Sequence, residues 1–142
     1  MLSGLYGVLR PLDLIQPYRL EMGTKLGNVQ GNNLYDYWGG GISEVLNEDE
    51  EKLIVNLASN EYFKAIDKKI LKAQILDIVF KEKKNDTYKV IGIYAKRARG
   101  LMINHIIRNR LTDVEALKDF SDEGYLYNQE LSSDKTWVYV RG

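Results

Sequence analysis

The pattern of apolar and polar residues changes period several times along the chain, which predicts interspersed helices and strands. Residues 33–48 repeat apolar side chains at helical spacing on either side of the Gly39–Gly41 run, so we expect two short helices joined there. The run 53–58 is apolar apart from Asn56 and of strand length, which predicts a buried strand. Residues 73–80 and 87–95 are rich in Ile, Val and Tyr and predict a β-hairpin.

The remaining segments continue this mixture. Ser59 is the expected N-cap of a helix that runs to about Leu71, and Asp113 is the expected cap of a later short helix. Residues 96–110 read as a helix, and residues 123–141 alternate as paired strands do. Because there is no regular βαβ rhythm, the sequence predicts a mixed α/β, α+β-like fold, in which helices pack on a mixed sheet.

Composition bounds the class of protein. The chain has 142 residues, 44% of them hydrophobic, with no repeat and no linker, so we expect one domain over residues 1–142. No apolar run approaches the ~20 residues that span a bilayer, which predicts a cytoplasmic protein with no membrane partner. Twenty basic and twenty acidic residues cancel, so an anion site has to come from local clustering.

The residue inventory limits the chemistry. With no cysteine, the chain has no disulfide, thiolate metal site or cysteine nucleophile. Its one histidine, His105, lies among apolar residues of the expected 96–110 helix, which favours a packed imidazole over a catalytic one. An iron or zinc site would need carboxylates almost alone, so we expect no metal and no cofactor.

The segment from Ser3 to Gly23 is dense in glycine, proline and arginine and has no amphipathic rhythm. Glycine and proline set unusual backbone conformations, and the guanidinium groups of Arg10 and Arg19 suit carboxylates or phosphates. The segment is therefore either part of a binding site or a well-ordered structural loop.

A second cationic cluster, Lys96, Arg97 and Arg99, falls where a strand is expected to end and a helix to begin. Cations at a helix N-terminus oppose the helix dipole, whereas an anion bound there would satisfy the free backbone N–H groups. This pattern indicates an anion site, most plausibly for phosphate. The alternative is that these cations pair with carboxylates such as Glu21 or Glu61.

A polar cluster, Asn56, Ser59 and Glu61, follows the buried strand at its carboxyl end, where open α/β sheets place ligands. Glu61 could act there as a general acid or base. The alternative is a helix cap at Ser59 and an acid at Glu61 that complements the helix dipole.

Several motifs occur in a fixed order: SGLYGVLRPLDLIQPYRLEMG, NLYDYWG, NLASNEYF, YAKRARGLM, EGYLY and the closing VYVR. Together they resemble the YaaA family of peroxide-stress proteins over almost the whole chain. The resemblance implies a cytosolic bacterial protein of the hydrogen peroxide response that limits intracellular iron and oxidative DNA damage and binds double-stranded DNA. It also implies a helix-hairpin-helix element and a positively charged cleft.

A typical member of that family has a substantial portion before the segment that starts here at Leu2. The resemblance therefore implies that residues 1–142 correspond to the C-terminal part of the family fold and that the N-terminal portion is absent. An apolar surface left open in this way favours self-association. The site candidates that fall within matching motifs are Arg10, Arg19, Glu21, Asn56, Ser59, Glu61, Lys96, Arg97, Arg99 and Arg141.

Two functions remain open. In the first, which we favour, the protein is not an enzyme and contacts DNA phosphates with little sequence specificity through Arg10, Arg19, Lys96, Arg97, Arg99 and Arg141, while Glu21, Asn56 and Ser59 support the site. In the second, it is an enzyme that acts on a nucleotide or other anionic small molecule, with Glu61 as acid or base and an arginine clamp. Direct iron sequestration is disfavoured by the shortage of His and Cys.

Overall fold

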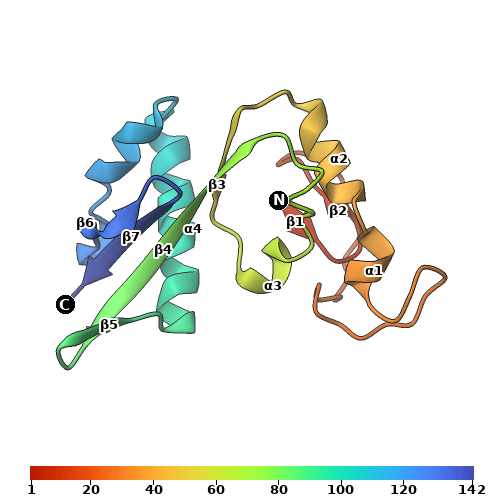
Figure 1. Ribbon diagram of the computed structural model, residues 1–142, viewed down its shortest axis with the longest axis horizontal. Coiled ribbons are helices and arrows are strands. Elements are labelled where there is room, and N and C mark those ends of the chain that lie inside the picture. Colours follow the sequence, from red (N-terminus) through yellow and green to blue (C-terminus); the bar gives the residue numbers. More distant parts are fainter. The chain divides into compact units, whose positions relative to one another are not determined.

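The computed structural model describes all 142 residues, and their contacts divide them into two compact units (Figure 1). Unit 1 consists of Met1–Ile54 and Ala58–Gln74. Unit 2 consists of Val55–Leu57 and Ile75–Gly142. None of the helices combines the length and the apolar character that a membrane crossing requires.

Unit 1 begins with a short antiparallel ribbon of β1 (Leu2–Ser3) and β2 (Gly7–Val8). Its helices are α1 (Leu34–Trp38), α2 (Gly41–Glu48) and α3 (Asn60–Phe63). The predicted pair of short helices with a glycine joint is confirmed, because the chain leaves α1 through Gly39 at φ 46°, a left-handed value that favours glycine.

The helix expected to run from Ser59 to about Leu71 is much shorter in the structure. It ends at Phe63, and the Asp67 side chain then accepts a hydrogen bond from the backbone N–H of Lys69 at 2.8 Å. Such a local side-chain bond stabilises a turn in competition with the helix. The turn still places Ala65 and Ile66 in the core of unit 1, which also contains Met22, Leu34 and Ile42.

Unit 2 is built on a mixed sheet. Its longest strand, β4 (Gln74–Lys84), pairs in parallel with β7 (Thr136–Arg141), and β7 pairs antiparallel with β6 (Leu126–Ser133). β3 (Leu53–Asn56), whose last residues belong to this unit, adjoins β4, and the short β5 (Thr87–Lys89) pairs with the far end of β4. Parallel and antiparallel pairs in one sheet, with helices packed on it, confirm the mixed α/β fold class.

Two predictions about the segment that leads into the first helix of unit 2 have to be corrected. The predicted strand over 87–95 ends at Lys89, and α4 (Gly92–Asn109) begins four residues before the expected start at Lys96. The first turn closes because the N–H of Ala95 donates to the carbonyl of Ile91 at 2.9 Å. After α4 come two 3₁₀ helices, η1 (Val114–Asp119) and η2 (Asp122–Gly124). Asp113 caps η1 as predicted, since its side chain accepts the N–H of Glu115.

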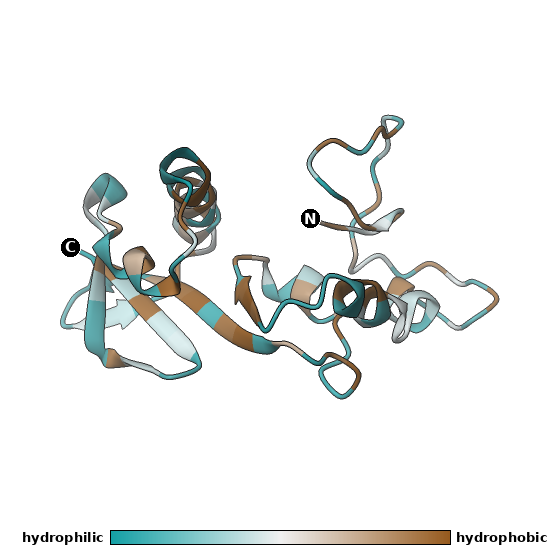
Figure 2. Ribbon diagram, turned by 90° about the horizontal axis from the view of Figure 1, so that it is seen from above, coloured by the Kyte–Doolittle hydropathy of each residue, from teal (hydrophilic) through white to brown (hydrophobic).

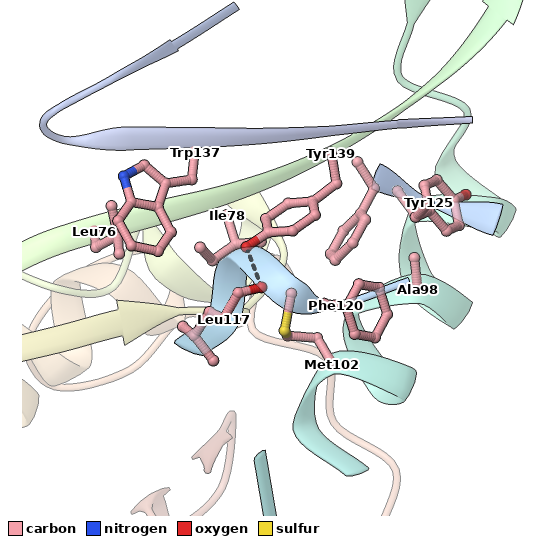
Figure 3. Close-up of a cluster of buried hydrophobic side chains, with 11 residues drawn as sticks. Leu76, Ile78, Ala98, Met102, Leu117, Phe120, Tyr125, Trp137 and Tyr139 are labelled. Carbon is pink, nitrogen blue, oxygen red and sulfur yellow. Dashed lines mark hydrogen bonds between the residues drawn. The ribbon is translucent and has the colours of Figure 1, made fainter. Parts of the chain in front are cut away.

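The alternation along β4 directs one face of the sheet into the core. Leu76, Ile78 and Phe80 are buried, and Figure 2 shows the corresponding bands of apolar and polar residues along this strand. α4 supplies the small side chains Ala95 and Ala98, which allow the helix to lie close to the sheet. The rest of the core is formed by Met102, Leu117, Phe120, Tyr125, Trp137 and Tyr139 (Figure 3).

Aromatic rings gather around Phe80 in this core. The ring centroids of Phe120, Tyr125 and Tyr139 lie 5.9, 5.1 and 5.4 Å from that of Phe80. The Tyr139 hydroxyl donates to the carbonyl of Leu117 at 2.8 Å, so its polar atom is satisfied inside the core (Figure 3). His105 packs edge-on against Phe120 at 5.5 Å, which agrees with the predicted packed imidazole.

We expect Tyr139→Phe to destabilise unit 2 by about 1 kcal/mol, because it removes one buried hydrogen bond while the Leu117 carbonyl keeps its bond from the Phe120 N–H. Hydrogen exchange of the β4 and β7 amides measures this loss. The matched control is Tyr88→Phe, since the Tyr88 hydroxyl makes no hydrogen bond in the structure. Equal losses in the two variants would contradict the assigned role of the Tyr139 hydroxyl.

Candidate functional site

Glu61 is held against the backbone of the Ser3–Gly23 segment. Its Oε1 accepts the N–H of Gly23 at 2.8 Å, and its backbone carbonyl accepts the Tyr35 hydroxyl at 2.9 Å. A Cβ at Gly23 would lie only 2.8 Å from that carboxylate oxygen, so a larger residue there would displace the Glu61 carboxylate from this position. The Glu61 carboxylate is exposed and fixed in direction, as an acid, base or ligand would be.

Tyr62 joins Glu61 to a second predicted residue, Glu21. Its hydroxyl donates to Glu21 Oε2 at 2.8 Å. Burial, the bond to Glu21 and the charges of both glutamates raise the pKa of Tyr62 to about 12. Burial and the charge of Glu61 also raise the pKa of Tyr35. We call these four residues, Glu21, Tyr35, Glu61 and Tyr62, the carboxylate–tyrosine cluster.

The other candidates in unit 1 lie outside this cluster. Arg10 forms an ion pair with Asp49 at 3.3 Å, and because both side chains are more than half exposed the pair contributes little stability. Arg19 is exposed and makes no ion pair. Ser59 precedes α3 as predicted, but its hydroxyl makes no capping hydrogen bond.

In unit 2, the early start of α4 changes the position of the predicted anion site. Lys96, Arg97 and Arg99 lie beyond the free N–H groups of the first turn of α4, which belong to residues 92–94, since the Ala95 N–H already donates to the Ile91 carbonyl. The dipole argument for an anion at these three residues therefore no longer applies. Lys96 is exposed, Arg99 is half-buried, and burial lowers the pKa of Arg99. Asn56 donates to Asp77 Oδ1 at 2.6 Å within this unit.

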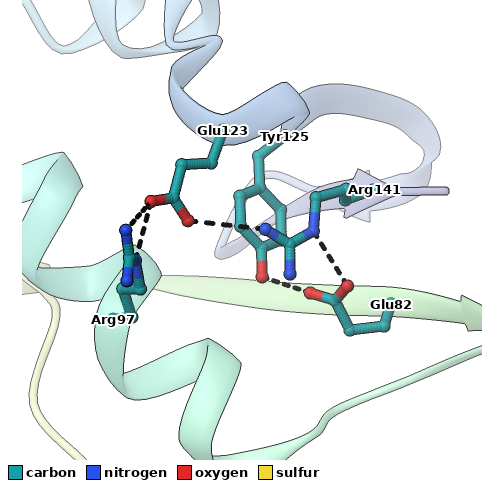
Figure 4. A network of polar contacts seen from close by, with 5 residues as sticks. All are labelled: Glu82, Arg97, Glu123, Tyr125 and Arg141. Atoms are coloured by element: carbon teal, nitrogen blue, oxygen red, sulfur yellow. Dashed lines mark hydrogen bonds and ion pairs between the residues drawn. The ribbon is translucent and has the colours of Figure 1, made fainter.

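Two of the predicted cations, Arg97 and Arg141, meet at one carboxylate (Figure 4). Arg97 Nε donates to Glu123 Oε1 at 2.7 Å, and Arg141 Nη1 lies 3.5 Å from Glu123 Oε2. Arg141 Nε also donates to Glu82 Oε2 at 2.9 Å. The alternative of a cation paired with a carboxylate therefore holds for Arg97, with Glu123 in place of Glu21 or Glu61.

Tyr125 completes this network. Its hydroxyl donates to Glu82, and the Arg141 guanidinium lies 4.5 Å from the Tyr125 ring centroid, within cation–π distance. The bond to Glu82 is the main reason that the pKa of Arg141 is raised. Because the network joins β4, β7, η2 and α4, it fixes these elements relative to one another (Figure 4).

The strongest local concentration of charge was missed by the sequence analysis. Residues 81–110 contain nine lysines and arginines and only two acids, Glu82 and Asp86. Of the nine, only Arg97 forms an ion pair in the structure. A count of charge in successive windows would have found this segment, which spans the end of β4, β5 and α4. Its cations are Lys81, Lys83, Lys84, Lys89, Lys96, Arg97, Arg99, Arg108 and Arg110.

Together these features define a mixed α/β protein with a concentrated cationic segment and a separate carboxylate–tyrosine cluster. The chain belongs to the peroxide stress protein YaaA family, whose model matches residues 1–131. This confirms the resemblance carried by the ordered motifs.

Curated relatives agree over nearly the whole chain. A UPF0246 protein of Acaryochloris marina is 57% identical over 143 residues, which cover 99% of this chain and 57% of the relative. UPF0246 proteins of Psychrobacter sp. and Neisseria gonorrhoeae are 56% and 52% identical, and the matched residues again cover 99% of this chain and 55% and 56% of those proteins. The chain thus spans a little over half the length of the curated relatives it matches.

We expect the Tyr62 phenol to titrate near pH 12, and Glu21→Gln to lower that pKa because it removes a negative charge that opposes the tyrosinate. A folded pKa above the unfolded value of 10 means that the contribution of this group to stability is complete below pH 10 and is lost as the pH rises through 12. NMR of ¹³Cζ-labelled tyrosine measures the titration, with Tyr62→Phe to assign the signal. Glu44→Gln, which removes an exposed glutamate that does not contact Tyr62, is the control.

Proposed function

We propose that this protein acts in the bacterial cytoplasm during peroxide stress by binding double-stranded DNA through its phosphates, and that it thereby helps to limit iron-dependent oxidative damage. The observation that carries the proposal is the positive charge of α4 and of the segment that leads into it from Asp86. No acidic residue occurs between Asp86 and Asp113, whereas six cations do. The family supports the biological role, since its description is a peroxide stress protein.

Unpaired cations are the useful ones for such binding. A lysine or arginine without a carboxylate partner can replace the counterions condensed on a phosphate, and their release drives association. Lys96 and Arg99 meet this condition on α4, as Arg19 does in unit 1. The charges of Arg10, Arg97 and Arg141 are offset by Asp49, Glu123 and Glu82, so we assign them a smaller share of the affinity. Phosphate contacts carry no base information, so little sequence preference is expected.

The carboxylate–tyrosine cluster supports a second candidate function, an enzyme that acts on a nucleotide or other anionic small molecule. Glu61 would be the acid or base, since its carboxylate is exposed and held by the Gly23 N–H. Nucleotides added to the ¹³Cζ-labelled protein test this candidate. A shift of the Tyr62 signal that disappears in Glu61→Gln supports it, and an unchanged Tyr62 signal at millimolar nucleotide rules it out.

We expect binding to a random duplex to weaken steeply as salt rises from 50 to 200 mM, and Lys96→Ala/Arg99→Ala to reduce the slope of log affinity against log salt by about 2, close to 0.9 per phosphate contact. Fluorescence anisotropy with two unrelated duplex sequences measures affinity, salt dependence and specificity together. Lys135→Ala, an exposed lysine in the β6–β7 turn, is the matched control. Affinity that is indifferent to salt would overturn the proposal.

Protection of DNA should depend on binding. We expect the protein to slow the nicking of a supercoiled plasmid by ferrous iron and hydrogen peroxide, and Lys96→Ala/Arg99→Ala to lose that protection in proportion to its lost affinity. Gel electrophoresis over time measures the nicked fraction, and Lys135→Ala should protect as the parent does. Full protection by a variant that no longer binds DNA would show that protection has another origin.

A further inference from the structure

We infer that the β4–β5 hairpin is a second DNA-contacting element, a two-stranded arm that enters a groove of the duplex and contacts phosphates through Lys83, Lys84 and Lys89. The inference rests on the proposed function, duplex DNA binding, and adds to it an element outside α4. None of these three lysines lies in the motifs that carried the family resemblance.

The arm is narrow because the sheet ends at its base. The pairing of β7 with β4 stops at Glu82 and Arg141, whereas β5 pairs with β4 from Glu82 to the tip of the hairpin. From Lys83 onward the hairpin therefore has only two strands. Asn85 has φ 53° at the tip, and the Thr87 hydroxyl donates to the Lys84 carbonyl at 3.1 Å, which closes a tight turn. In Figure 1 the hairpin extends beyond the other strands of unit 2.

Cations occupy both faces of this arm. The register places Glu82 opposite Lys89, Lys83 opposite Tyr88, and Lys84 opposite Thr87. Because residues directly opposite each other share a face and successive residues alternate, Lys84 and Lys89 lie on one face and Lys83 on the other. None of the three lysines forms an ion pair, and the lysine side chains are free to reach an external anion.

The two acids of the arm differ in their effect. Glu82 is held by Arg141 Nε at 2.9 Å and by the Tyr125 hydroxyl, so its charge is neutralised within unit 2. Asp86 lies at the tip and has no cationic partner in the structure. It is thus the one acid of the arm whose charge opposes binding of a polyanion. Its neutralisation should raise the affinity for DNA, whereas loss of the lysines should lower it.

The network in Figure 4 connects the base of the arm with α4. Glu82, which precedes the first free residue of the arm, is bonded to Arg141, and Arg141 and Arg97 share Glu123. Arg97 belongs to α4. The arm and the cationic helix are therefore held at one relative position, and Arg141 acts as a positioning residue for both.

The dimensions of a duplex favour this arm as a groove contact. The major groove of B-DNA is about 12 Å wide and admits a two-stranded β-ribbon. A ribbon with lysines on both faces can meet the phosphates of both groove walls. The major groove of an RNA duplex is deep and narrow, so the same arm is excluded from it.

We expect Lys83→Ala/Lys84→Ala to weaken duplex DNA binding about tenfold at 150 mM salt and to reduce the salt slope by about 2. Lys83→Arg/Lys84→Arg should retain affinity, and Asp86→Asn should increase it several-fold. The parent chain should bind an RNA duplex of the same sequence more weakly, and the double alanine variant should lose less affinity for it. Lys135→Ala, at the tip of the β6–β7 hairpin, is the matched control.

Lysine acetylation of the parent chain provides a readout without any substitution, since bound duplex should protect Lys83 and Lys84 but not Lys135. If the parent binds DNA in a salt-dependent way that requires Lys96 and Arg99, while Lys83→Ala/Lys84→Ala binds equally well, the arm is not a contact and the proposed function stands. If the parent does not bind duplex DNA at all, the proposed function and the arm fail together. Equal losses on DNA and RNA duplexes would overturn groove entry.

Discussion

The parallel pairing of β4 with β7 is the interaction on which unit 2 depends. It joins residues 77–82 to residues 136–141, and it aligns Ile78 with Trp137 and Phe80 with Tyr139 in register. These aromatic and aliphatic side chains form the face of the sheet on which α4 and η1 pack. A one-residue slip would turn the buried face of β4 toward solvent, so the register also determines where Glu82 meets Arg141. The position of the ion-pair network therefore follows from the packing of the core.

Basic side chains serve two different purposes in unit 2. Arg97 and Arg141 are paired with Glu123 and Glu82 and connect elements of the fold. Lys96 and Lys83 form no ion pair, and in the proposed function their charges meet the phosphates of DNA. A guanidinium suits the first purpose because its fork bonds two carboxylates at once, as Arg141 does. An ammonium suits the second, since a flexible stem lets it reach a phosphate from several positions.

The sequence predicted the mixed fold class, the helix pair around Gly39, the Asp113 cap and the final pair of strands because each depends on local pattern or turn chemistry. The sequence-based predictions failed where tertiary contacts decide which secondary structure or which partner a residue adopts. The segment 90–95 is rich in Ile and Tyr, as strands are, but Ala95 faces the sheet as part of a helix. Among the site candidates, the contact of Glu61 with Gly23 and the pairing of Arg141 with Glu82 join residues far apart in the sequence, and no local signal indicates which partner each would choose.

The zero net charge of the chain conceals a strong separation of charge. The nine cations and two acids of residues 81–110 are followed by a segment, 113–134, that contains seven acids and one lysine. At 0.1 M salt the Debye length is about 10 Å, so a phosphate at the surface responds to nearby charges and not to the sum over the chain. The acids of the second segment do not cancel the first, because apart from Glu123 they form no ion pair with its cations. The zero net charge is therefore no argument against the proposed DNA binding, because the fold gathers unpaired cations on α4 and on the β4–β5 hairpin.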